Sequence, residues 1–135
     1  MALQIQTMEQ MRATHAMKRI KDVADTEKAW QSRCKSYVKA LPAEILTEGL
    51  GQALATHLAA AENGRDPHRF LYDAVSDWLC RSSPYAPYQG ESDILLAITR
   101  HGASAYRAAQ REAMSYLVWL KKFAVAFLAD VEGAE

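Results

Sequence analysis

Histidines, cysteines and a glycine pair are the residues of this chain whose types could support catalysis or ligand binding. The histidines are His15, His57, His68 and His101. They form neither an H-E-x-x-H motif nor a Glu-x-x-His pair, the spacings with which a helix presents zinc or di-iron ligands. A metal site assembled only by the fold is left open. His15 lies one turn from Arg12 and Arg19, so we expect an exposed surface histidine there.

The other reactive residue types also lack a catalytic context. Cys34 and Cys80 are far apart in the sequence and have no ligand-like spacing, so we expect small buried apolar side chains. Gly49 and Gly51 begin a glycine-rich pattern, but Leu54 replaces the third glycine and no strand precedes them. We expect these glycines to let a neighbouring helix approach closely. With no G-x-S-x-G motif and no P-loop lysine, the sequence predicts a protein without enzyme activity, cofactor or bound metal.

Basic residues follow a more regular pattern near the start of the chain. A predicted second helix carries residues at steps of four, three and four, without a carboxylate: Lys28, Ser32, Lys35 and Lys39. On the predicted first helix, Lys18 and Lys21 lie one turn apart, and Arg12, His15 and Arg19 form an adjacent row. If the two helices are antiparallel neighbours, the rows could merge into one cationic strip. Cations about 5–6 Å apart along a helix can meet successive phosphates of a nucleic acid. An ordinary solvated face is the alternative.

Helices are the elements that must position these residues. The 135-residue chain has 24 alanines against 17 Ile, Val and Thr residues, which favours helix over strand. Proline, cap and glycine signals place helices at about 3–24, 26–40, 42–61, 67–80, 93–100 and 104–131. Asp25 or Thr26, Asp66, Ser92 and Ser104 are the expected caps. The sequence therefore predicts an all-α fold: a single-domain helical bundle of about six helices over residues 1–135, with a long C-terminal helix.

The last predicted helix separates an apolar stripe from a basic face. Large residues from Tyr106 to Val131 recur every three or four positions, which is the pattern of a buried face. The same steps place Arg107, Arg111, Ser115 and Lys122 on a polar, basic face. Residues expected in the core or in a subunit interface are Trp30, Tyr37, Ile45, Leu50, Leu54, Trp78, Leu117, Trp119, Leu120 and Phe123.

Charge is segregated although the formal net charge is zero. Residues 1–40 contain eight Lys and Arg against four Asp and Glu, and residues 41–99 contain three against eight. Residues 100–135 contain five against four. Nucleic-acid binding depends on where cations cluster, so a neutral total does not exclude it. No apolar run approaches the roughly 18 residues of a spanning helix, and two isolated cysteines suit a reducing compartment, so we expect a cytoplasmic protein that does not bind a membrane.

Two stretches go beyond a general helical pattern. The first runs from Leu41-Pro42 through Gly49-Leu50 to Gln52-Ala53-Leu54-Ala55. The second contains Tyr106-Arg107, Glu112-Ala113 and the string Trp-Leu-Lys-Lys-Phe-Ala at 119–124. In this order and at this separation, they resemble the small α-helical subunit of the type III-B (Cmr) CRISPR–Cas effector complex. The run from Arg12-Ala13 to Val23 is similar to the first helix of that family.

The resemblance implies a non-catalytic scaffold. Members of the family stack head to tail as the minor filament of an RNA-guided complex, and their cationic face lines the channel of guide and target RNA. The expected partners are therefore other subunits of the Cmr complex, further copies of this chain, and the backbones of guide RNA and target RNA. The RNA-binding candidates are Lys18, Arg19, Lys21, Arg33, Lys35, Lys39, Arg107, Arg111 and Lys122. The alternative is a helical protein–protein adaptor whose basic face meets an acidic partner without RNA.

Overall fold

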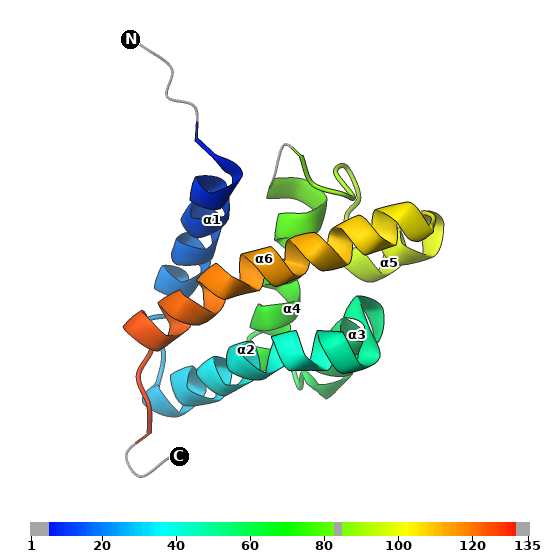
Figure 1. The fold of residues 1–135 in the computed structure, drawn as a ribbon. Coiled ribbons are helices and arrows are strands. Elements are labelled where there is room, and N and C mark those ends of the chain that lie inside the picture. Colours follow the sequence, from blue (N-terminus) through cyan, green and yellow to red (C-terminus); the bar gives the residue numbers. More distant parts are fainter. Residues whose placement is uncertain (1–5, 83–84, 132–135) are drawn as a thin grey trace.

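A computed structural model of the chain describes residues 6–82 and 85–131 (Figure 1). The described residues contain six α-helices and one π-helical turn, and no strand. The helices are α1 (Met8–Asp22), α2 (Lys28–Glu48), α3 (Leu50–Ala60), α4 (Pro67–Asp77), α5 (Ile94–Arg100) and α6 (Ala103–Phe127). The π-helical turn η1 (Trp78–Ser82) continues directly from α4. The predicted all-α fold with a long C-terminal helix is confirmed.

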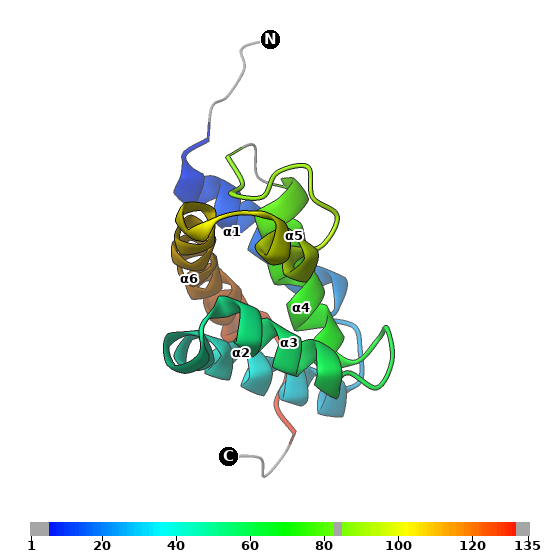
Figure 2. The same ribbon diagram turned by 90° about the vertical axis from the view of Figure 1, so that its right-hand side faces the viewer.

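Helix α6 is the element that connects α1 to α2. It crosses the molecule diagonally and packs against α1 and α2 (Figures 1 and 2). Helix α2 also packs against α3 and α4, and α5 completes the bundle next to α3 and η1. A single helix therefore fixes the relative positions of the first and second helices.

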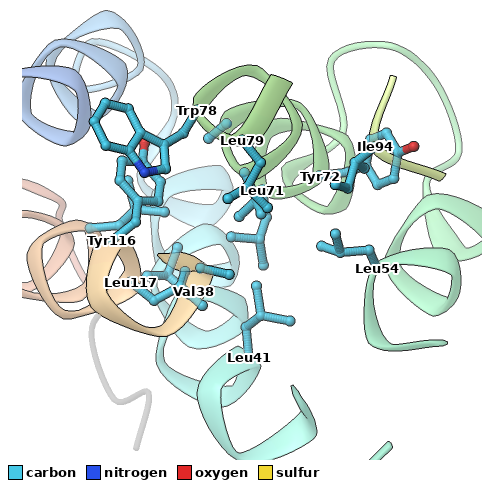
Figure 3. Packing of buried hydrophobic residues seen from close by; sticks show 14 of the residues in the cluster. Val38, Leu41, Leu54, Leu71, Tyr72, Trp78, Leu79, Ile94, Tyr116 and Leu117 are labelled. Carbon is cyan, nitrogen blue, oxygen red and sulfur yellow. The ribbon is translucent and has the colours of Figure 1, made fainter. Parts of the chain in front are cut away.

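The large residues that the sequence placed in the core are buried or partly buried there. Figure 3 shows three of them, Leu54, Trp78 and Leu117, packed among other buried side chains. Fully or almost fully buried are Ile45, Leu50, Leu54, Trp78, Leu117 and Leu120, and partly buried against them are Trp30, Tyr37, Trp119 and Phe123. Tyr72, Tyr88 and Tyr116 add buried aromatic rings that the sequence pattern did not single out. Both cysteines are buried, as expected, and burial raises the pKa of Cys34 to about 12.

Pro42 does not end a helix, contrary to the prediction. Helix α2 continues through it to Glu48. Pro42 has no N–H to donate within the helix, but Leu41 and Ile45 on either side are fully buried. The burial of these two side chains offsets the cost of the helix hydrogen bond that Pro42 cannot form. The helix ends instead at Gly49, whose φ of 88° lies in the left-handed region that favours glycine.

The start of α3 is capped by side chains of α6. The amide of Leu50 donates to Gln110 Oε1 at 3.0 Å, and the amide of Gly51 donates to the Tyr106 hydroxyl at 3.0 Å. These bonds satisfy N–H groups that have no partner within the helix. A Cβ atom on Gly49 would lie 3.1 Å from the Tyr106 hydroxyl. The expected close approach is therefore confirmed at Gly49 only, because a Cβ atom on Gly51 would lie 3.6 Å from Ile98, an ordinary van der Waals contact.

Local capping signals set other helix ends. Thr7 and Gln10 form a reciprocal capping box at α1, and Asp66 followed by Pro67 begins α4 as predicted. Three predicted caps are wrong. Glu27 rather than Asp25 or Thr26 precedes α2, and its side chain forms no capping hydrogen bond. Asp93 rather than Ser92 caps α5, because its carboxylate accepts from the amides at 95 and 96. Gly102 rather than Ser104 precedes α6, which ends at Phe127 rather than near 131.

A charged network links α1, η1 and α6. The Arg12 guanidinium donates to Glu112 through Nε at 2.6 Å and Nη2 at 2.8 Å. Trp78 Nε1 donates to the same carboxylate at 2.9 Å, and a third Arg12 nitrogen reaches Glu9 at 2.8 Å. This bidentate arrangement raises the pKa of Arg12, chiefly through the hydrogen bond to Glu112. The guanidinium therefore remains charged throughout the pH range in which the protein folds.

His15 is part of the interior and not an exposed histidine, so that prediction is wrong. Its Nδ1 lies 2.6 Å from the Tyr116 hydroxyl, its Nε2 lies 2.8 Å from Asp77 Oδ2, and its side chain is 11% exposed. A neutral ring satisfies both contacts, with Nε2–H donating to Asp77 and Nδ1 accepting from Tyr116. Although Asp77, His15 and a hydroxyl follow the order of a catalytic relay, Tyr116 is fully buried and cannot reach a substrate. The network is structural.

Within the described parts of the chain, every helix is too short or too polar to cross a bilayer.

Gly49→Ala should lower the free energy of unfolding by about 1–2 kcal/mol, because alanine resists the left-handed conformation and crowds Tyr106. Gly64→Ala is the matched control, since no described atom lies within 4 Å of its added methyl group. That variant should be neutral or slightly stabilising. Urea unfolding followed by circular dichroism measures both, and equal stability of the two variants would contradict this account of the helix break.

The free energy of unfolding should fall as the pH drops below about 6.5, the ordinary pKa of histidine. Burial lowers the pKa of His15, so the unfolded chain takes up a proton at a higher pH than the folded chain. Burial lowers the pKa of His68 in the same direction. Urea unfolding between about pH 7.5 and 5.5 should show a shallower loss of stability for His15→Gln than for the unmodified protein. Thr14→Gln, at an exposed position on α1, should keep the original dependence, and an unchanged slope in His15→Gln would refute the assignment.

Candidate nucleic-acid interface

The nine predicted RNA-binding residues lie on three helices that α6 brings together. Helix α1 carries Lys18, Arg19 and Lys21; α2 carries Arg33, Lys35 and Lys39; and α6 carries Arg107, Arg111 and Lys122. The hypothesis that the first two helices pack side by side is wrong. Each of them packs against α6, and over their described residues α1 and α2 do not form a packed pair of their own. The predicted single cationic strip along both helices therefore does not form by direct helix pairing.

Arg19 and Arg33 nevertheless meet at one groove of about 620 Å³. The connection between α3 and α4 adds Arg65, a residue that sequence reasoning missed. We call this the arginine groove; its apolar wall consists of Val23, Trp30 and Phe70. None of the three guanidiniums forms an ion pair with another described residue. The groove thus places three arginines without a described ion pair beside an aromatic wall.

Ring contacts hold the wall of the arginine groove in place. The Arg19 guanidinium carbon lies 5.7 Å from the centroid of Phe70, within cation–π range. Trp30 packs edge-on against Phe70 at 5.8 Å, and its Nε1 donates to the backbone oxygen of Arg65 at 2.7 Å. The tryptophan therefore ties the α3–α4 connection to α2. A loop arginine next to an Asn-Gly turn gave no periodic signal, which is why the helix pattern did not identify Arg65.

Carboxylates also line the arginine groove. Asp66 is buried and accepts from the amide of His68, and Asp73 pairs with Arg69 at 2.9 Å. Asp25 and Glu27 are exposed and form no ion pair with another described residue. Phosphate would therefore be attracted on the arginine side of the groove and repelled near the α1–α2 connection. The lining of the groove is therefore mixed in charge and does not form a uniform basic strip.

Lys35 differs from its predicted role. Its side chain is 10% exposed, and its Nζ lies 3.0 Å from Asp130 Oδ2. Although this face of α2 carries no carboxylate of its own, as predicted, Asp130 reaches it from the segment that follows α6. Ala129 N–H donates to Gln31 at 2.8 Å and fixes the same segment to α2. Lys35 secures the chain after α6, whereas Lys39, one turn further along α2, is exposed.

The remaining lysines are accessible to solvent. Lys18 lies at a groove of about 370 Å³ that also includes His15 and Asp77. Lys21 Nζ lies 4.4 Å from the ring centroid of Phe127, so this cation rests on an aromatic face of α6. Lys122 is exposed on α6. These three positions can contact a phosphate without breaking an ion pair to another described residue.

A histidine cluster that sequence spacing did not predict joins α2, α3 and α4. His57 Nδ1 lies 2.9 Å from His68 Nδ1, and His57 Nε2 lies 2.8 Å from Glu44 Oε1. The ring of Tyr37 stacks on His68 with centroids 3.8 Å apart. Glu44 and His68 contact opposite nitrogens of His57, so the three side chains do not converge on one point. Among residues 6–82 and 85–131, no three potential ligands form a metal-binding group.

Arg107 and Arg111 lie at a different groove, of about 560 Å³, with Leu46, Tyr106 and Met114. Both arginines are exposed, as predicted for the basic face of the last helix. That face also carries Val118 and Val125, which are 53% and 51% exposed. The structure thus divides the predicted residues between the arginine groove with its neighbouring lysines and an apolar groove on α6.

Comparisons with known proteins agree with the fold and with the motif order. The family model described as CRISPR-associated protein (Cas_Cmr5) matches residues 8–127. A crystal structure of a CRISPR-associated Cmr5 family protein from Thermus thermophilus is similar with a TM-score of 0.72 and 22% sequence identity. The match covers 91% of this chain and 99% of that chain, and at this identity it supports the fold alone. Because the family match spans α1 to α6, the chain belongs to the Cmr5 family of CRISPR-associated proteins.

Proposed function

We propose that this chain is a non-catalytic structural subunit of an RNA-guided type III-B CRISPR–Cas effector complex. Copies of it stack in a helical filament, and their exposed cations contact the backbones of guide and target RNA. The observation that carries the proposal is the convergence of Arg19, Arg33 and Arg65 from three separate segments at one groove. Membership of the Cmr5 family supports the association with the other subunits of such a complex.

Backbone contact suffices for a subunit of this kind. In an RNA-guided complex, base pairing between guide and target reads the sequence, so a scaffold subunit needs only phosphate contacts. Arginine and lysine supply these contacts without base-specific geometry. The proposed RNA-contacting set is Lys18, Arg19, Lys21, Arg33, Lys39, Arg65 and Lys122. Lys35 is omitted, because reaching a phosphate would require breaking its pair with Asp130.

A protein–protein adaptor remains the second candidate, favoured by one observation. Leu46 is 73% exposed beside Arg107 and Arg111. An aliphatic side chain forms no favourable contact with a phosphate, whereas a protein partner could bury it. The two roles are compatible, because the apolar groove and the arginine groove share no lining residue among those described.

Arg19→Glu combined with Arg33→Glu should weaken binding of target RNA by the assembled complex. The loss should be similar for unrelated guide-matched targets, because phosphates rather than bases are contacted. The slope of log affinity against log salt concentration should become shallower by about 1.4–1.8, since each of the two lost phosphate contacts removes about 0.7–0.9. Filter binding over a salt series, with the incorporation of the subunit checked by native mass spectrometry, measures both effects.

Arg69→Glu combined with Arg100→Glu is the control, because it changes the charge by the same amount. Both of these guanidiniums already pair with a carboxylate, so we do not expect them to contact RNA. It should leave the salt slope unchanged. If the Arg19 and Arg33 variant enters the complex normally and keeps the original affinity and slope, the arginine groove does not contact RNA.

A further inference from the structure

The groove beside Leu46 has a composition different from that of a phosphate-binding surface. It is lined by residues of the last turn of α2 and the first half of α6, beside the start of α3. We call it the Leu46 groove. Its lining residues are Leu46, Tyr106, Arg107, Gln110, Arg111, Met114 and Ser115. Neither a lysine nor a carboxylate is among these described residues.

Leu46 projects from the bundle without contributing to it. Ile45, its neighbour in α2, is fully buried, whereas Leu46 is 73% exposed. Removing a leucine side chain from water is favourable, so the exposure of Leu46 leaves an apolar contribution unused in the isolated chain. Met114 and Tyr106 are only partly buried beside it. A partner that covers the groove would gain that contribution.

The apolar surface continues along α6 beyond the groove. Met114, Val118 and Val125 follow one another at steps of four and seven residues, which keeps them on one side of a helix. The two valines are about half exposed. An elongated strip of this kind matches the way in which an amphipathic helix docks, with apolar anchors every three to four or seven residues.

The walls of the Leu46 groove are already fixed. Gln110 and Tyr106 each accept a hydrogen bond from an amide at the start of α3, so their side chains are held in place before any partner arrives. Pre-organisation of this kind reduces the ordering cost of binding. The groove can therefore act as a preformed docking site.

The charge of the groove indicates the chemistry of its partner. Arg107 and Arg111 form no ion pair with any other described residue, and none of the described lining residues is a carboxylate that could neutralise them. Arginine, tyrosine and methionine are enriched at protein interfaces, whereas lysine is depleted there. RNA could neutralise the guanidiniums, but it would leave Leu46 and Met114 uncovered. The composition favours protein over RNA.

We propose that the Leu46 groove docks an acidic amphipathic segment of a partner protein in the effector complex. Apolar side chains of that segment cover Leu46 and Met114, and its carboxylates pair with Arg107 and Arg111. This interaction goes beyond the proposed RNA contacts and does not depend on the arginine groove.

Site-specific photo-crosslinking in the assembled complex identifies what occupies the groove. With Leu46 replaced by p-benzoylphenylalanine, irradiation should crosslink the subunit to a protein segment in which Asp or Glu flanks apolar residues. Arg107→Glu combined with Arg111→Glu should reduce the crosslink about tenfold, as expected for paired hot-spot arginines. Replacing the identified carboxylates by lysine should then restore it. A crosslink to RNA, to a segment without carboxylates, or to nothing would overturn the proposal.

Leu46→Arg separates the two classes of partner in a second measurement. An added cation should strengthen binding at an RNA surface, whereas in an apolar docking site it should lower the incorporation of the subunit about tenfold. Leu96→Arg is the control at another exposed leucine, on α5, and should assemble normally. Unfolding midpoints of both variants should equal that of the unmodified chain, since both side chains are exposed. Normal incorporation of Leu46→Arg with higher RNA affinity would refute protein docking.

Discussion

Glu112 forms the interaction on which the arrangement of this bundle depends. Its carboxylate receives two nitrogens of Arg12 from α1 and the indole nitrogen of Trp78 from η1, while its own backbone belongs to α6. The carboxylate side chain is only 13% exposed, so removing one partner would leave a charge with little access to water. One carboxylate therefore fixes the register of α1 against α6. That register sets the position of each cation of α1, including Arg19 at the arginine groove.

Helix α6 also connects the two candidate binding surfaces. Its first half supplies the arginines of the Leu46 groove and the side chains that cap α3. At its other end, the following segment is held on α2 by Lys35 and Gln31. Because α6 contacts the bundle along its whole length, both grooves are built on a rigid element. This arrangement suits a scaffold, in which surfaces must keep fixed positions relative to each other.

Much of the fold could be read from local signals. Asp66-Pro67 begins α4, and Gly49 contributes to a helix boundary. Three- and four-residue steps identify the buried face of α6 as far as Ala124, whereas Phe127 and Val131, also expected on that face, are exposed. The failures also have a local cause. Pro42 predicts a helix end when only its neighbours along the chain are considered, but the burial of Leu41 and Ile45 carries α2 past it. The same reasoning placed His15 on the surface, because Tyr116 and Asp77 are distant in the sequence.

The sequence by itself determined the helical class, the core stripe and the family, because these follow from periodicity, capping and motif order along one chain. Only the tertiary structure decided which of the described cations are paired. Lys35 meets Asp130 from the far end of the chain, and Arg12 meets Glu112 across 100 residues. Arg19, Arg33 and Arg65 converge without an ion pair to any described carboxylate. A charge is neutralised by whatever lies within a few ångströms of it, and helix periodicity carries no information about partners that another helix brings.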